Sequence, residues 1–179
     1  LGLISIVGMP YTVLMPIFAT DILHGGPHTL GFLMGASGVG AVTGAIFLAS
    51  RRSVIGLEIV IAIASGIFGA GLIVFSLSRI LWLSLVLLIL TGFGMMVQTA
   101  SSNTVLQTIV DDDKRGRVMS FYAMSFMGTA PFGSLLAGTL ASRIGTPGTL
   151  IIGGALSILG SLIFASRLPL LIKMVRPMY

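Results

Sequence analysis

The chain has 179 residues, of which 55% are hydrophobic and only 8% are charged, and its net charge is +5. Because about a quarter of the residues of soluble domains are charged, a mean hydropathy of +1.09 excludes a water-soluble globular fold. A basic chain can bind nucleic acid, but here the Lys and Arg residues lie in short segments beside apolar runs, so no nucleic-acid partner is expected. The absence of cysteine excludes disulfides and thiolate metal sites.

Six apolar runs follow one another along the chain, at about residues 1–20, 30–50, 57–77, 81–107, 118–141 and 149–166. Each is long enough to cross a bilayer as a helix. Strands are not expected, because lipid cannot satisfy open backbone groups and a barrel would show short alternating segments. We predict an all-α membrane protein with one transmembrane domain, 1–168, and a tail, 169–179. Since the chain does not begin with Met and residue 1 already lies inside an apolar run, we expect a longer parent protein.

The Lys and Arg residues occur mainly in alternate gaps between these runs. Eight of the ten lie in the segments 51–52, 114–117 and 167–176, whereas Arg79 and Arg143 occupy the other gaps. Lys and Arg are retained on the cytoplasmic side of membrane proteins. The pattern therefore predicts six crossings with both ends in the cytoplasm.

A weak internal repeat appears at an offset of 92 residues. The sequence Thr-Val-Leu at 12–14 recurs at 104–106, and Leu-Ala-Ser-Arg at 48–51 recurs at 140–143. Under the predicted topology the two copies of this second motif lie on opposite sides of the membrane. The repeat thus predicts two inverted three-helix units, as in each half of a major facilitator transporter.

Small residues at roughly four-residue spacing mark the second and fifth runs. Glycines in these rows are Gly31, Gly35, Gly40, Gly44, Gly133 and Gly138. Such rows let helix backbones approach closely inside a membrane. We predict that they pack against neighbouring helices, and sliding of the helices during a transport cycle is compatible with the same pattern.

The fourth run carries a polar face. Thr91, Met95, Gln98 and Ser102 recur at heptad-like spacing, and Asn103 adjoins them. A polar face avoids lipid, so it either forms hydrogen bonds between helices or lines a water-filled path.

The first run, the inverted partner of the fourth, is interrupted by Gly8, Pro10 and Pro16. Broken runs in corresponding positions of two repeats indicate a transporter site. Tyr11 and Met15 are therefore candidate contacts for an amphipathic substrate, with core packing as the alternative.

Charged residues gather before the fifth run and after the second. The candidate residues of a cytoplasmic gate are Arg51, Arg52, Glu58, Asp113, Arg115 and Arg117. They form either a solvated turn or a latch that closes in one state of a transport cycle. No charged side chain lies deep in any run, so we expect this chain to lack the carboxylate that couples transport to protons.

An enzyme is not expected. His24 and His28 share a short Gly-Gly-Pro turn, where a structural role is favoured over a weak metal site. No set of nucleophile, base and orienting group can be assembled within the runs, and no phosphate-binding loop of a primary pump is present. No cofactor or metal is predicted.

Several segments resemble the C-terminal half of one branch of the major facilitator superfamily. They include Met-Pro-Tyr-Thr-Val-Leu at 9–14, Leu-His-Gly-Gly-Pro at 23–27, Ala-Ser-Gly-Val-Gly-Ala at 36–41, Gly-Phe-Gly-Met-Met at 92–96 and Arg-Gly-Arg-Val-Met-Ser at 115–120. That branch contains the enterobactin-exporter-like and macrolide-efflux-like permeases, also called transmembrane secretion effectors. One departure is Ser50, which stands where the superfamily's loop motif has an acidic residue.

The resemblance implies spans seven to twelve of a twelve-helix, proton-driven exporter in a bacterial inner membrane. Its substrate would be a small amphipathic molecule such as a siderophore, a drug or another metabolite, and its partners would be the lipid bilayer and an N-terminal six-helix half. The alternative is a non-transporting membrane interaction module, or a truncated fragment without activity of its own.

Overall fold

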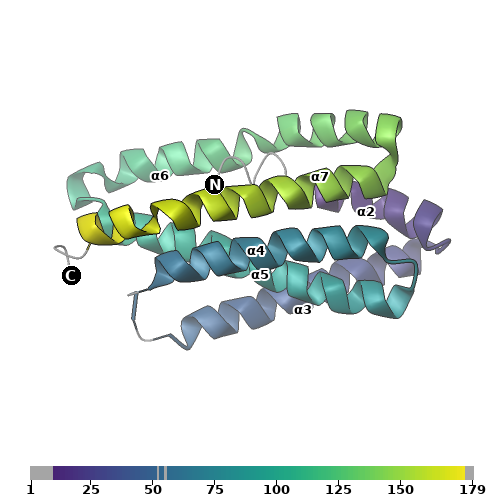
Figure 1. The fold of residues 1–179 in the computed structure, drawn as a ribbon, viewed down its shortest axis with the longest axis horizontal. Helices are drawn as coiled ribbons and strands as arrows, with labels where there is room; N and C mark the ends of the chain where they lie inside the picture. Colours follow the sequence, from purple (N-terminus) through teal and green to yellow (C-terminus); the bar gives the residue numbers. More distant parts are fainter. Residues whose placement is uncertain (1–9, 52, 55, 176–179) are drawn as a thin grey trace.

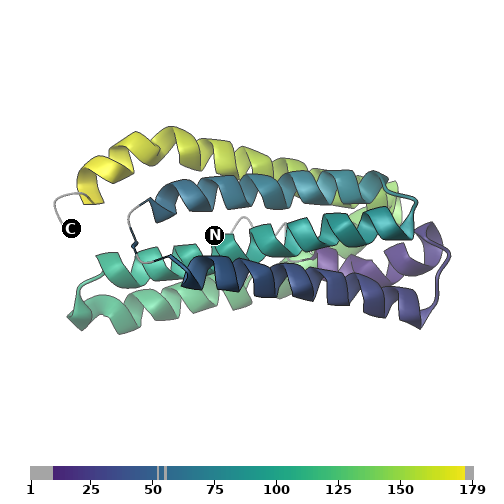
Figure 2. The same cartoon turned by 90° about the horizontal axis from the view of Figure 1, so that it is seen from below.

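The computed structural model describes residues 10–175 except 52 and 55, with side chains up to residue 168. All regular elements within these residues are helical (Figure 1): α2 (Tyr11–Ile17), the π-helical segment η1 (Phe18–Ile22), α3 (Pro27–Ala49), α4 (Leu57–Leu77), α5 (Leu81–Ile109), α6 (Asp112–Met127) and α7 (Ala130–Val175). The long helices run side by side along one common axis (Figures 1 and 2). The first nine residues of the first predicted span lie outside the described residues.

The helix α7 consists of two helices joined at a sharp turn. At the turn Gly145 has φ 78° and ψ 161°, a conformation that residues with a side chain rarely adopt. Pro147 follows in the first turn of the second helix, where its missing N–H costs no hydrogen bond. The gap between the fifth and sixth predicted runs, residues 142–148, is therefore helical in the structure except at Gly145.

The helix α6 begins at Asp112, several residues before the expected apolar run. Asp112 and Asp113 occupy its first turn, where carboxylates interact favourably with the positive end of the helix dipole. The helix ends at Met127 with Gly128 as its C-cap, and α7 begins at Ala130. The fifth predicted span is therefore interrupted near its middle.

Three helix pairs, α3 with α5, α5 with α4 and α4 with α7, approach so closely at a glycine that no side chain would fit there. A Cβ placed on Gly40 in α3 would meet the carbonyl of Ile89 in α5, and one on Gly94 in α5 would lie 2.8 Å from the carbonyl oxygen of Ala64 in α4. A Cβ on Gly69 in α4 would lie 2.6 Å from the carbonyl oxygen of Gly154 in α7. Close backbone approach of this kind is typical of helices that associate inside a membrane.

The hydrophobic core lies where α2 and η1 cross the other helices. Its largest members include Tyr11, Phe18, Leu33, Phe68, Leu72, Phe75 and Leu88. The rings of Phe18 and Phe75 are tilted with their centroids 4.3 Å apart, and this contact fixes η1 against α4.

Apolar side chains also cover the outside of the bundle. The helix α6 has no buried residue among its sixteen, and its Phe121, Met124 and Met127 are 71%, 67% and 76% exposed. Large exposed apolar surfaces of this extent suit contact with lipid or another membrane segment. The structure is that of an all-α membrane protein.

Four helical stretches of the described residues are long and apolar enough to cross a membrane: Pro27–Ala49, Leu57–Leu77, Leu81–Ile109 and Asp112–Leu168. The last has 57 residues, and the turn at Gly145 divides it into two lengths that could each cross. Tyr11–Ile22 is a shorter apolar helix. The count of six crossings stays a prediction.

The two ends of the bundle differ in charge. At one end α3, α5 and α7 end and α4 and α6 begin (Figures 1 and 2). Its described cations are Arg51, Lys114, Arg115, Arg117 and Arg167, and we call it the basic end. The opposite end holds the turn of α7 and the connection between α4 and α5, with Arg143 and Arg79 beside them.

Candidate functional site

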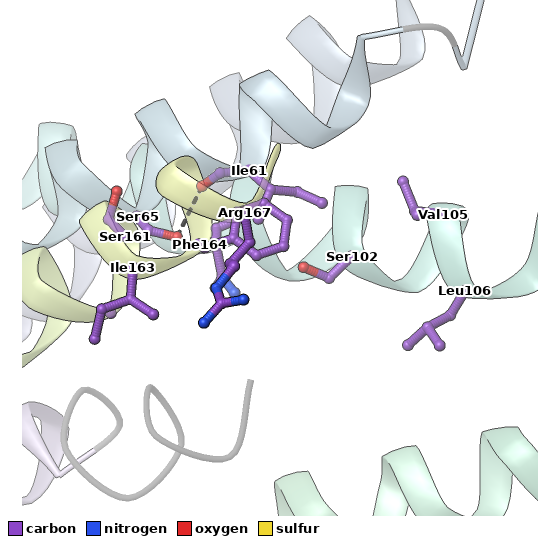
Figure 3. Close-up of a pocket in the computed structure, with 11 residues that line it drawn as sticks. Ile61, Ser65, Ser102, Val105, Leu106, Ser161, Ile163, Phe164 and Arg167 are labelled. Atoms are coloured by element: carbon purple, nitrogen blue, oxygen red, sulfur yellow. Dashed lines mark hydrogen bonds between the residues drawn. The ribbon is translucent and has the colours of Figure 1, made fainter. Parts of the chain in front are cut away.

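A cleft of about 580 Å³ opens between α4, α5 and α7 toward the basic end (Figure 3). Its lining residues are Ile61, Ser65, Gln98, Ser102, Val105, Leu106, Gly160, Ser161, Ile163, Phe164 and Arg167. They come from the start of α4, the last third of α5 and the later part of α7. A mostly apolar wall with a few polar groups is typical of a site for a small molecule.

Two of the polar groups in the cleft are already hydrogen-bonded to backbone carbonyls. The hydroxyl of Ser65 donates to the carbonyl of Ile61 at 2.8 Å within α4. The hydroxyl of Ser161 donates to the carbonyl of Ala62 at 2.6 Å, which ties α7 to α4. These serines therefore keep acceptor lone pairs for a ligand, but their protons are engaged.

Gln98 and Ser102, both predicted as cavity residues, line the cleft on neighbouring turns of α5. Their side chains are largely buried, with 2% and 7% exposure. The side-chain Oε1 of Gln98 accepts a long hydrogen bond of 3.4 Å from the hydroxyl of Thr99. Ser101 lies between them in sequence, and its fully buried hydroxyl has no hydrogen-bond partner among the described residues. The end of α5 therefore holds more polar groups than its own helix satisfies.

The other predicted cavity residues lie away from this cleft. Tyr11 and Met15 belong to the hydrophobic core, where the Tyr11 hydroxyl forms a 2.8 Å hydrogen bond with that of Ser37. The buried hydroxyl of Thr91 donates to the carbonyl of Leu87 at 2.8 Å.

Met95 and Asn103 are half-buried. Met95 packs against the edge of the hydrophobic core, whereas Asn103 accepts a 3.0 Å hydrogen bond from the Gln107 amide on the next turn of α5. The structure thus gathers two of the seven predicted cavity residues in the cleft. The remaining five lie along α2 and α5.

The predicted gate residues that the structure describes, which are Arg51, Glu58, Asp113, Arg115 and Arg117, all belong to segments at the basic end. Within the described residues the ion pairs are Arg115 with Asp112 at 2.7 Å and Lys114 with Asp111 at 3.1 Å, both exposed and both inside the start of α6. Exposed pairs of this kind contribute little to stability.

Among the described residues, the cross-connection that a latch requires is not formed. No ion pair links Asp113 or Arg117 to Arg51 or Glu58 in the described part of the chain. Arg51 lies between α3 and α4 and lines a smaller cleft with Thr104 of α5. Arg52 lies outside the described residues.

The predicted packing glycines have different surroundings. Gly40 and Gly44 lie against the backbone of α5, and Gly133 is buried. No heavy atom lies within 4 Å of a Cβ placed on Gly31, Gly35 or Gly138.

Four further glycines, which lie outside the predicted rows, also make close contacts between helices. Gly69, Gly92, Gly94 and Gly154 all lie against backbone atoms of a neighbouring helix. Among so many apolar residues, a glycine that is not part of a four-residue row gives no distinctive signal. Ser161 and Arg167 were not predicted to line a cleft. A signal for Ser161 was present, since Thr149, Gly153, Ser157 and Ser161 recur at four-residue spacing in α7.

Comparison with known proteins places this bundle in a family. The family model described as transmembrane secretion effector matches residues 3–174. The staphyloferrin A transporter of Staphylococcus aureus (strain NCTC 8325 / PS 47) is 26% identical over 162 residues, which cover 90% of this chain and 40% of that protein. The chain thus spans about 40% of the length of this relative. No solved structure matches the chain.

The family match covers nearly every helix described above, including the three that form the cleft. It also agrees with the all-α membrane fold and with the motifs of the loop before the fifth apolar run. The chain therefore belongs to the transmembrane secretion effector family of the major facilitator superfamily.

Proposed function

We propose that this chain is one half of a secondary exporter that moves a small amphipathic molecule out of a bacterial cell, in partnership with a second six-helix half. The observation that carries the proposal is the cleft of about 580 Å³, with polar groups set in an apolar wall inside a membrane bundle. A molecule with an apolar body and a polar head would satisfy both kinds of lining.

Membership of the family supports transport rather than catalysis. The S. aureus relative is named for the transport of staphyloferrin A, and this chain matches 40% of its length, close to the share that one half would have. Transporters of the major facilitator type are built from two six-helix halves with the substrate site between them. The cleft would be this half's share of that path.

The charge difference between the two ends of the bundle indicates the side of the membrane to which the cleft opens. Because Lys and Arg are retained on the cytoplasmic side, we place the basic end in the cytoplasm and assign the chain to the inner membrane. A cleft that opens there would receive its substrate from inside the cell. Rocking of the two halves would then close this opening and expose the site to the outside.

Coupling and gating follow from the positions of the charges. The acidic residues Asp21, Glu58 and Asp111–Asp113 all lie at helix ends, so a coupling carboxylate would come from the second half. At the basic end, Asp113 or Arg117 would pair with Arg51, Arg52 or Glu58 when the inner opening closes. The open cleft and the lack of such a pair among the described residues are compatible with the same inward-open state.

The proposal is tested by comparing the small molecules that cells secrete with and without the protein. In a strain that carries the full-length protein as the sole copy, Gln98→Leu should remove at least one small amphipathic compound from the medium and raise it inside the cells, at equal membrane abundance. Thr108→Val, on an exposed position of the same helix, is the matched control. Identical secreted compounds in the deletion, the Gln98 variant and the wild type would instead favour a non-transporting membrane module.

A further inference from the structure

We propose that the cleft selects amphipathic molecules that carry an anionic head group, and that Arg167 is the residue that recognises this group. The inference rests on the proposed transport function and adds the chemical class of the substrate. It is based on the set of hydrogen-bond donors in the cleft that have no partner among the described residues.

Arg167 is the only charged residue that lines the cleft within the described part of the chain. None of the chain's five acidic residues contributes to the lining, so no carboxylate is present to balance a cationic ligand. The Arg167 guanidinium forms no ion pair with another described residue. Its charge therefore remains available, and a planar guanidinium binds carboxylates, sulfonates or phosphates through paired hydrogen bonds.

The uncharged groups favour the same kind of ligand. The protons of Ser65 and Ser161 are used in hydrogen bonds to the carbonyls of α4, at 2.8 and 2.6 Å. The groups that can still donate are the side-chain amide of Gln98 and the hydroxyl of Ser102. In Figure 3 the Ser102 hydroxyl lies on the side of α5 toward Arg167, whose guanidinium extends away from α7 into open space. A head group with several acceptor oxygens would use these donors together.

The rest of the wall suits an apolar body. Ile61 and Leu106 face the cleft from α4 and α5, and Phe164 adds an aromatic ring from α7, one turn before Arg167. Arg167 itself is exposed, so the charged end of a ligand would bind beside solvent while its other end packs against this apolar wall. The combination predicts a molecule with one anionic end and one apolar end.

A competing role for Arg167 is an ion pair with Glu58. Glu58 lies one turn before Ile61 in α4 and is half-buried, but it is neither paired with Arg167 nor part of the lining. If the arginine served only to hold this carboxylate, removal of either charge would have the same effect on binding. This difference between the two roles decides the design of the experiment.

The experiment measures binding of two fluorescent dyes with the same xanthene core to the full-length protein in lipid nanodiscs. Carboxyfluorescein is the anionic probe and rhodamine 123 the cationic probe, and fluorescence anisotropy reports binding. The wild type should bind carboxyfluorescein more tightly. Arg167→Gln should weaken that binding about tenfold, equivalent to ~1.4 kcal/mol, and leave rhodamine 123 unchanged or bound more tightly. Arg167→Lys should retain part of the affinity, while Arg79→Gln, at the opposite end, should match the wild type.

Equal binding of both dyes, binding of neither dye, or an unchanged carboxyfluorescein affinity in Arg167→Gln would each overturn the inference. Weakening of the same size in Glu58→Gln would assign Arg167 to an ion pair and overturn it as well. None of these results bears on export itself, which the secretion comparison tests separately. Identical secretion by the wild type, the deletion and the Gln98 variant, with anion-selective dye binding intact, would reject the transport function and leave the binding site.

Discussion

Replacement of Gly40 by alanine tests the closest contact in the bundle. The new Cβ would meet the carbonyl of Ile89 and lie 2.9 Å from the backbone nitrogen of Phe93. Both atoms belong to the backbone of α5, so no side-chain rotation can relieve the overlap. The helices α3 and α5 would have to separate.

The magnitude follows from comparison with Gly35→Ala in the same helix. Each substitution gains about 1 kcal/mol of helix propensity, because alanine is the better helix former. No heavy atom lies within 4 Å of a Cβ on Gly35, so that variant should keep the gain. Overpacking at Gly40 costs about 1–3 kcal/mol. The propensity gain cancels in the difference, so Gly40→Ala should be about 1–3 kcal/mol less stable than Gly35→Ala.

The assay is unfolding of each purified variant in mixed micelles titrated with sodium dodecyl sulfate, with helix content followed by circular dichroism. The free energies of unfolding are compared at one detergent composition. Equal stability of the two variants, or a more stable Gly40→Ala, would refute the packing of α3 against α5 described above.

Three further results are expected. Ser161→Ala removes the 2.6 Å hydrogen bond from α7 to α4 and should lower the unfolding free energy by about 1 kcal/mol in the same titration, so an unchanged value would contradict a stabilising role for this bond. A reporter domain inserted after Pro147 should be extracytoplasmic and one after Ser53 cytoplasmic, and finding both on one side would reject the topology. Asp113→Asn and Arg117→Ala should each reduce secretion at unchanged membrane abundance, with a double variant no worse than either if the two residues act as one unit. Wild-type secretion in both single variants would show that these gate residues serve only to set the membrane topology.

Hydropathy alone predicts most of the helices. The bounds of α3, α4 and α5 lie within a few residues of the apolar runs at 30–50, 57–77 and 81–107. The predicted helix bounds are less accurate where local backbone geometry, rather than hydropathy, determines where a helix begins or ends. Gly145 allows the chain to turn with a single non-helical residue, and acidic residues extend α6 beyond the apolar run.

The candidate site was predictable only in part. The polar face of α5 indicated Gln98 and Ser102, because polar residues in an apolar run must face the interior of a bundle. The same pattern could not separate them from Thr91, which lies on that face but is packed in the core with its proton bound to Leu87. Arg167 could not be assigned from the sequence, since cations after a last span are equally explained by topology.

The cleft at the basic end is proposed to form part of a substrate path that opens to the cytoplasm. Because this chain has no cysteine, Ser102→Cys would add one thiol within it. Its reaction with a membrane-impermeant maleimide should be measured in inside-out and right-side-out vesicles that contain the full-length protein, cleared of any other cysteine. We expect fast labelling in inside-out vesicles, slowed by an exported compound, and slower labelling in right-side-out vesicles. Absence of labelling in both orientations, or labelling that an exported compound does not slow, would show that the cleft is not part of a substrate path open to the cytoplasm.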